Sequence, residues 1–265
     1  MLTHSPLRQT QDQLSDAFRD VLKARPLWLP KNVRRVKWST ISANADRNAL
    51  GLLCDAKEAS GKIVHLDDTL LVLKAKPSVY CLVDMSLIPK YQTLVLGSKV
   101  TLSPYKRKSL VDGLALDAPR VRDNGVRSVI IGETQTRLPE RPSEGYLADL
   151  ADQLEALPMP DGYRTIANAL ADWQATDFTW VQDDKTITYV LRFTMTAPTY
   201  TGPMKIIYDR ACDTYSLRYD APGSGKCDPS LPQVTDIHFD ELAGHLSHIA
   251  GDQDSWCLVT VSPVT

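Results

Sequence analysis

The sequence has few cysteines, no long apolar run and none of the short motifs typical of common catalytic sites. Its five cysteines are odd in number and contain no CxxC pair, which argues against a disulfide framework and against a zinc ribbon. No apolar stretch approaches the roughly 20 residues that span a bilayer, and the first 16 residues contain no signal-peptide core. We therefore expect a cytoplasmic protein without membrane insertion.

The motifs that mark enzyme active sites are missing as well. The sequence contains no GxSxG elbow, no GxGxxG turn after a strand and no P-loop in a strand–helix context. Adjacent carboxylates such as Asp67 and Asp68 fall where hairpin turns are predicted, and Asp favours turns for backbone reasons. The sequence thus favours a protein that acts by binding over an enzyme, and it indicates no cofactor.

What the sequence does contain is a strong asymmetry of charge. Residues 1–141 carry 23 Lys and Arg against 14 Asp and Glu, whereas residues 142–265 carry 7 against 18. A change of sign between two halves suggests two electrostatic roles and two domains. The segment TQTRLPERPSEG (134–145) interrupts the pattern with two prolines and a glycine. We expect domains at 1–138 and 139–265.

The basic half is predicted to be mostly β after an N-terminal helix. The apolar spacing over residues 8–23 is typical of a helix, and a short second helix is expected over 44–56. GKIVHLDDTLLVLKAKPSVYCLVDMSLI (61–88) has the pattern of three short strands with tight turns, and two more strands are expected at 96–102 and 127–132. These strands predict a small antiparallel, barrel-like sheet.

Residues 61–105 resemble a known type of domain. The order GKIVHLDD, LLVLKA, YCLVDMSLI and LGSKVTL is similar to the small β domain of Kfr-type and other accessory proteins of conjugative plasmids. The final element of that domain corresponds here to the run from Leu96 to Leu102. The resemblance implies a plasmid or other mobile genetic element as the setting, and it carries over no catalytic residue.

This half contains three basic clusters, at residues 31–37 beside Trp28 and Trp38, at 106–108 beside Tyr105, and at 120–127. Phosphates attract cations and exposed bases stack on flat rings, so this combination indicates a nucleic-acid surface. The alternatives are a solvated face whose aromatics belong to the core, or a face that docks on an acidic protein or on the acidic half of the chain. The candidate binding residues are Arg34, Arg35, Lys37, Trp38, Lys106, Arg107 and Lys108.

The acidic half is predicted to be an antiparallel sheet covered by helices, which makes the whole chain an α+β protein. Helices are expected over 144–157 and 162–173. Four strands rich in aromatic and β-branched residues follow, with QDDK (182–185) and RACD (210–213) as hairpin turns.

A histidine-bearing helix over 238–249 raises the question of a metal site. Glu241, His245 and His248 lie on one helical stripe with His238, so a metal would be held by Glu241 with His245, or by His245 with His248. The spacing is not that of HExxH or of di-iron bundles, and further ligands would have to come from elsewhere. The alternative is an amphipathic helix with a polar shoulder.

Three functions follow from these observations. The first is a non-enzymatic regulatory or inhibitory protein of a plasmid, of the fertility-inhibition type, that binds a protein partner such as a component of the conjugation machinery. The second is a DNA- or RNA-binding accessory protein that uses the basic half. The third is a metal-dependent enzyme centred on His245. The oligomeric state stays open.

Overall fold

The computed structural model divides the chain into two compact units. The first comprises residues 1–106 and 256–265, and the second comprises residues 107–255. The sequence places a domain boundary between residues 138 and 139, where the charge changes sign. The two units are instead defined by which residues contact one another. The first unit carries 16 Lys and Arg against 9 Asp and Glu, and the second 14 against 23. The structure describes residues 10–24, 26–29, 35–42, 46–47, 53–54, 57–88, 93–116, 118, 120–121, 127–128, 135–183, 187–219, 233–252 and 259–264.

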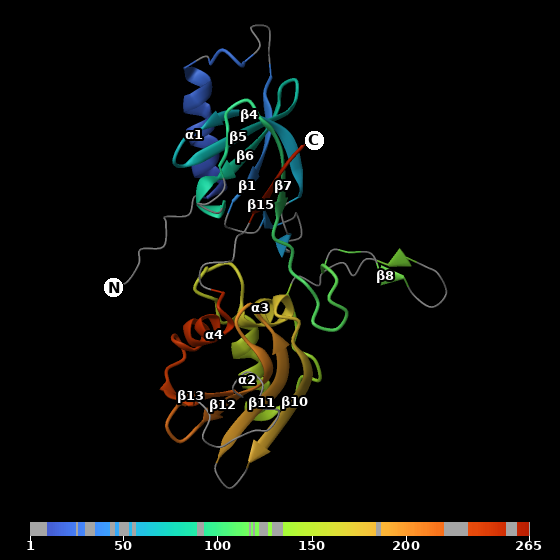
Figure 1. The fold of residues 1–265 in the computed structure, drawn as a ribbon, viewed down its shortest axis with the longest axis vertical. Helices are drawn as coiled ribbons and strands as arrows, with labels where there is room; N and C mark the ends of the chain where they lie inside the picture. Colours follow the sequence, from blue (N-terminus) through green and yellow to red (C-terminus); the bar gives the residue numbers. More distant parts are fainter. Residues whose placement is uncertain are drawn as a thin grey trace. The chain divides into compact units, whose positions relative to one another are not determined.

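The first unit is built on a six-stranded mixed sheet with the order β1-β6-β5-β4-β7-β15. Its elements are α1 (Gln11–Lys23), β1 (Lys37–Ile41), β4 (Ala59–Leu66), β5 (Leu70–Lys76), β6 (Val79–Asp84), the 3-10 turn η1 (Met85–Leu87), β7 (Lys99–Pro104) and β15 (Val259–Pro263). The strands at 61–88 confirm the prediction. The last strand of the chain, drawn in red in Figure 1, lies beside β7.

Two expectations for this unit are wrong. The sheet is neither closed nor fully antiparallel, because β1 pairs in parallel with β6 and the order ends at β1 and β15. The expected helix over 44–56 is replaced by the short pair β2 (Asp46–Arg47) and β3 (Leu53–Cys54). Asn and Gly are weak helix formers, and Asn44, Asn48 and Gly51 all fall in this segment.

Helix α1 covers part of one face of this sheet. Its N-cap Thr10 forms a capping box with Gln13, and Leu14 and Phe18 are fully buried. Phe18 meets Tyr80 at a ring distance of 5.6 Å and Trp38 at 5.5 Å. Figure 1 shows α1 alongside this sheet.

The second unit confirms the prediction of an antiparallel sheet packed against helices. Its strands are β8 (Arg120–Val121), β9 (Arg127–Ser128), β10 (Thr176–Asp183), β11 (Thr188–Thr196), β12 (Thr201–Asp209), β13 (Thr214–Tyr219) and β14 (Gln233–Ile237). Its helices are α2 (Gly145–Ala156), α3 (Ile166–Asp172) and α4 (Leu242–Ala250). Strands β10 to β14 form one sheet in sequence order. Helices and sheet share one large core, which includes Leu154, Leu170, Leu191, Ile206 and Leu246.

None of the described helices is both long and apolar enough to cross a membrane.

Candidate nucleic-acid interface

Three lysines stand side by side across the sheet of the first unit. Lys62 of β4 lies directly opposite Lys74 of β5 on one side and Lys99 of β7 on the other. Directly opposed residues point to the same face of a sheet. Neighbouring strands are about 4.8 Å apart, so the three lysines span about 10 Å. We call Lys74, Lys62 and Lys99 the lysine row.

The lysine row continues a row of aromatic residues that α1 covers. Lys74 is paired in register with Tyr80, and Tyr80 with Trp38. The ring of Tyr80 is 1% exposed and packs against Phe18 of α1. Helix α1 contacts β1, β6 and β5. The same sheet face therefore has a covered aromatic part and a part that carries lysines.

The part with the lysines is lined by hydroxyl groups. Ser60 lies opposite Thr101 with their oxygens 2.8 Å apart, and Thr101 lies opposite Ser262 of β15. Lys62, Lys99 and Ser60 are exposed. Serine, threonine and lysine side chains are common donors to phosphate oxygens. This face thus offers cations and small hydroxyl donors together.

The charges of the lysine row are not neutralised by nearby carboxylates. Among the described residues, none of the three lysines forms an ion pair, and the Lys74 ammonium donates to the carbonyl of Trp28 at 3.4 Å. Glu58, which accepts a hydrogen bond from Ser103, stands immediately before β4 and four residues before Lys62. That separation is about 13 Å along a strand, beyond the ~8 Å Debye length at physiological salt. The row presents a net positive face.

The cluster predicted around residues 34–38 is distributed differently. Arg34 lies outside the described residues, and Arg35 and Lys37 are exposed at the start of β1. Trp38 is partly buried, donates from Nε1 to Ser15 at 3.2 Å and lies edge-on to Phe18. Its indole therefore packs between α1 and the sheet.

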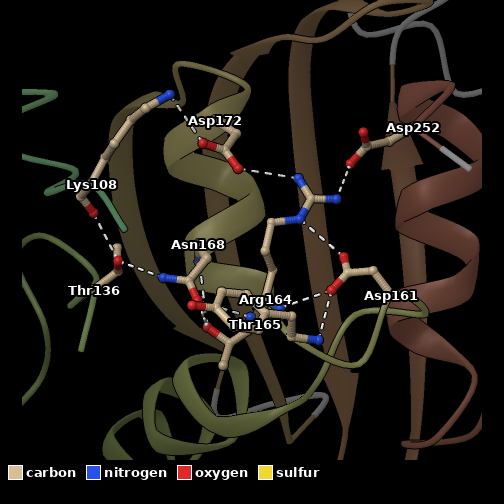
Figure 2. A network of polar contacts seen from close by, with 9 residues as sticks. Lys108, Thr136, Asp161, Arg164, Thr165, Asn168, Asp172 and Asp252 are labelled. Atoms are coloured by element: carbon tan, nitrogen blue, oxygen red, sulfur yellow. Dashed lines mark hydrogen bonds and ion pairs between the residues drawn. The ribbon is translucent and has the colours of Figure 1, made fainter. Parts of the chain in front are cut away.

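The predicted cluster at 106–108 is engaged within the protein. Arg107 is 8% exposed. The Lys108 ammonium lies 3.1 Å from Asp172, and its carbonyl accepts a hydrogen bond from Thr136 (Figure 2). Lys106 is partly exposed and has a polar or electrostatic contact of its own. Sequence reasoning did not single out Lys62, Lys74 and Lys99, which the sheet brings side by side.

Lys108 belongs to a buried polar network centred on Arg164. The guanidinium of Arg164, 2% exposed, contacts Asp161, Asp172 and Asp252 at 3.0, 3.1 and 2.6 Å (Figure 2). Burial opposes the charge of Arg164, but the carboxylates of Asp161, Asp252 and Asp172 outweigh it and raise its pKa. The network ties α3 to the end of α4, so its role is to hold the second unit together.

A pocket of about 400 Å³ lies beside this network. It is lined in part by Lys108, Leu110, Val111, Asp172 and Gln174. The charged side chains that line this pocket are already in ion pairs: Lys108 pairs with Asp172, and Asp172 also pairs with Arg164.

The candidate metal ligands lie at the start of α4 and along it. Glu241 is the N-cap residue, and its carboxylate accepts from the backbone N–H of His238 at 3.2 Å. His245 is partly exposed and His248 is exposed. Within the described part of the chain, no three His, Cys, Asp or Glu side chains form a group able to hold a metal ion.

Comparison with known proteins found no matching family model, no matching curated protein and no matching solved structure.

Proposed function

We propose that this protein binds the phosphate backbone of double-stranded nucleic acid through the lysine row of its first unit. The observation that carries the proposal is the direct opposition of Lys62 to both Lys74 and Lys99 on an exposed, hydroxyl-lined face. Like charges placed opposite each other in a sheet repel, and a polyanion that neutralises them removes this cost. The positive balance of the whole unit attracts the same ligand.

The chemistry of the face favours backbone contacts over recognition of bases. The aromatic side chains of this row, Trp38 and Tyr80, pack against α1 and do not form a stacking surface beside the lysines. A multi-stranded sheet face does not enter the major groove, which admits a helix or a two-stranded ribbon. Binding should therefore be independent of sequence and strongly dependent on salt.

The lysine row lies entirely within residues 61–105, the segment that resembles the plasmid accessory domain. If the resemblance reflects a shared role, this segment is also the part that contacts nucleic acid in a mobile element. Regulation or inhibition of conjugation through a protein partner stays a prediction from the sequence.

The proposal is tested by measuring the affinity for a labelled duplex at 50 and 200 mM salt by fluorescence anisotropy. The comparison is between the full chain and Lys62→Gln/Lys74→Gln/Lys99→Gln. The slope of log K against log salt is negative, and loss of three phosphate contacts should make it shallower by about 2.7. Between the two salt concentrations, that contribution amounts to about 40-fold in affinity.

The matched control removes three other cations from the same unit, as Arg19→Gln/Lys23→Gln/Lys57→Gln. All three side chains are exposed, and Arg19 and Lys23 pair with Asp16 and Asp20 on α1, so the charge change is equal but the row is intact. Equal losses in both variants would show general charge attraction and contradict a site at the row. Absence of duplex binding by the full chain would reject the proposal and favour a protein partner.

A further inference from the structure

A second row of cations crosses the sheet of the acidic unit. Arg192 of β11 lies directly opposite Lys205 of β12, and Lys205 lies directly opposite Arg218 of β13. Residues 142–265 contain only seven Lys and Arg, and three of them stand in this row. We call Arg192, Lys205 and Arg218 the arginine–lysine row.

The arginine–lysine row occupies the face of the sheet opposite to the helices. Along β11, the alternate residues Tyr189, Leu191 and Phe193 are buried in the core shared with α2, α3 and α4. Arg192 stands between Leu191 and Phe193 and points to the other side. Arg192 and Arg218 are exposed, and Lys205 is partly exposed.

The row forms no ion pair with any carboxylate in the described part of the chain. The next row on the same face is Val181, Val190, Ile207 and Ser216. The carboxylate of Asp209 is one row further, four residues from Lys205 and thus about 13 Å along the strand. Asp177 and Asp236 stand nearer to the row, in the irregular parts of β10 and β14, and neither forms an ion pair with it. Within the described residues, the three like charges therefore stand beside one another without a paired carboxylate.

We propose that the arginine–lysine row is a second binding surface for the nucleic-acid phosphate backbone, separate from the lysine row. The inference rests on the proposed function only for the class of ligand, because its residues and its unit are different. Arg192, Lys205 and Arg218 present guanidinium and ammonium donors over about 10 Å, a length that carries about six phosphates in a duplex. The negative balance of the rest of the unit, 11 Lys and Arg against 23 Asp and Glu, leaves this face as the one that a polyanion can approach.

Two surfaces in one chain should bind more tightly than either alone, provided that both reach the same nucleic acid molecule. The test therefore uses a background in which the lysine row is already neutralised. In Lys62→Gln/Lys74→Gln/Lys99→Gln, residual duplex binding should persist with a salt slope of about 2.7. Adding Arg192→Gln/Lys205→Gln/Arg218→Gln should abolish that binding.

A matched pair of single variants separates position from charge. Arg218→Gln and Arg210→Gln each remove one arginine from the same unit, but Arg210 lies over the Tyr146 ring at 3.9 Å and outside the row. Arg218→Gln removes one phosphate contact, so it should weaken residual binding about 3.5-fold more at 50 mM than at 200 mM salt, whereas Arg210→Gln should not change the salt slope. Equal effects of the two variants would overturn the inference.

The folded state supplies a readout that does not depend on binding. Lys205 has a cation on either side, so Lys205→Gln should raise the melting temperature at low salt, and the gain should shrink as salt is added. Addition of duplex DNA to the lysine-row variant should likewise raise its melting temperature.

No residual binding in that variant would reject the second surface and leave the proposed function intact. Unchanged binding in the lysine-row variant, lost on neutralising Arg192, Lys205 and Arg218, would reject the first surface alone. Binding of polyglutamate in place of DNA would overturn the choice of nucleic acid as the ligand.

Discussion

Arg164 donates a 2.6 Å hydrogen bond to Asp252, a residue 88 positions further along the chain. The contact joins the segment before α3 to the residue that follows the end of α4, and both side chains are buried. Asp161 and Asp172, which are close to Arg164 in the sequence, contact the same guanidinium. One cation therefore holds three carboxylates that would otherwise repel one another in a site of low solvent access.

Replacing Arg164 should destabilise the second unit strongly. Arg164→Met leaves Asp161, Asp172 and Asp252 without their shared partner, and removing one side of a buried ion pair costs about 3–5 kcal/mol. Urea denaturation followed by tryptophan fluorescence measures the loss, with Trp173 and Trp180 reporting on the second unit and Trp28 and Trp38 on the first. The control Arg19→Met breaks an exposed pair with Asp16, where the expected change is below about 0.5 kcal/mol. Similar effects of the two substitutions would contradict a structural role for the network.

Two glycines at the fourth helix should respond to alanine in opposite directions. Gly251 ends α4 with φ +67°, and a Cβ there would lie 2.3 Å from Cγ2 of Thr199. Gly251→Ala should therefore cost more than the about 1–2 kcal/mol of the left-handed backbone alone. Gly244 lies inside the helix with nothing within 4 Å of its added Cβ, so Gly244→Ala should stabilise by about 0.5–1 kcal/mol. Thermal melts of both variants provide the comparison, and destabilisation by Gly244→Ala would contradict the open space seen there.

The hairpin between β4 and β5 should contribute a stability that disappears in acid. Burial works against ionisation of Asp67, but hydrogen bonds from the N–H groups of Thr69 and Leu70 and from the His65 side chain lower its pKa to about 2. A carboxyl with a lowered folded-state pKa stabilises fully above its unfolded value near 3.8 and loses this contribution as the pH falls toward 2. Because Asp67 is half exposed, the contribution should be about 1 kcal/mol after solvent screening. Asp67→Asn should flatten the stability profile between pH 4 and 2, and an unchanged profile would show that another group titrates there.

Much of the fold follows from local signals in the sequence. The short apolar runs within residues 61–88 and the turn residues between them predict the strands β4, β5 and β6, and the structure confirms them. The RACD turn at 210–213 also fixes the register of β12 against β13, which places Lys205 opposite Arg218. The turn between Thr196 and Thr201 places Arg192 opposite Lys205 in the same way. The arginine–lysine row could therefore have been predicted from the turns.

The lysine row could not be predicted in this manner. Near the turn of the first hairpin, Leu66 pairs with Leu71 and His65 with Val72, a register that would place Lys62 opposite Ala75. An irregularity between Ile63 and His65 shifts the ladder by one residue and brings Lys62 opposite Lys74. A bulge of this kind depends on how the strand packs, and no residue in the segment predicts it.

The sequence by itself determined the charge of each half, the period-2 strands and the tight turns, because these depend on residues close together in the chain. Only the tertiary structure decided which distant segments pair. Strand β15 crosses from the far end of the sequence to join β7, and the buried Arg164 selects Asp252 among many carboxylates. The pairing of distant segments depends on burial and register over whole sheets, so no short stretch of sequence determines it.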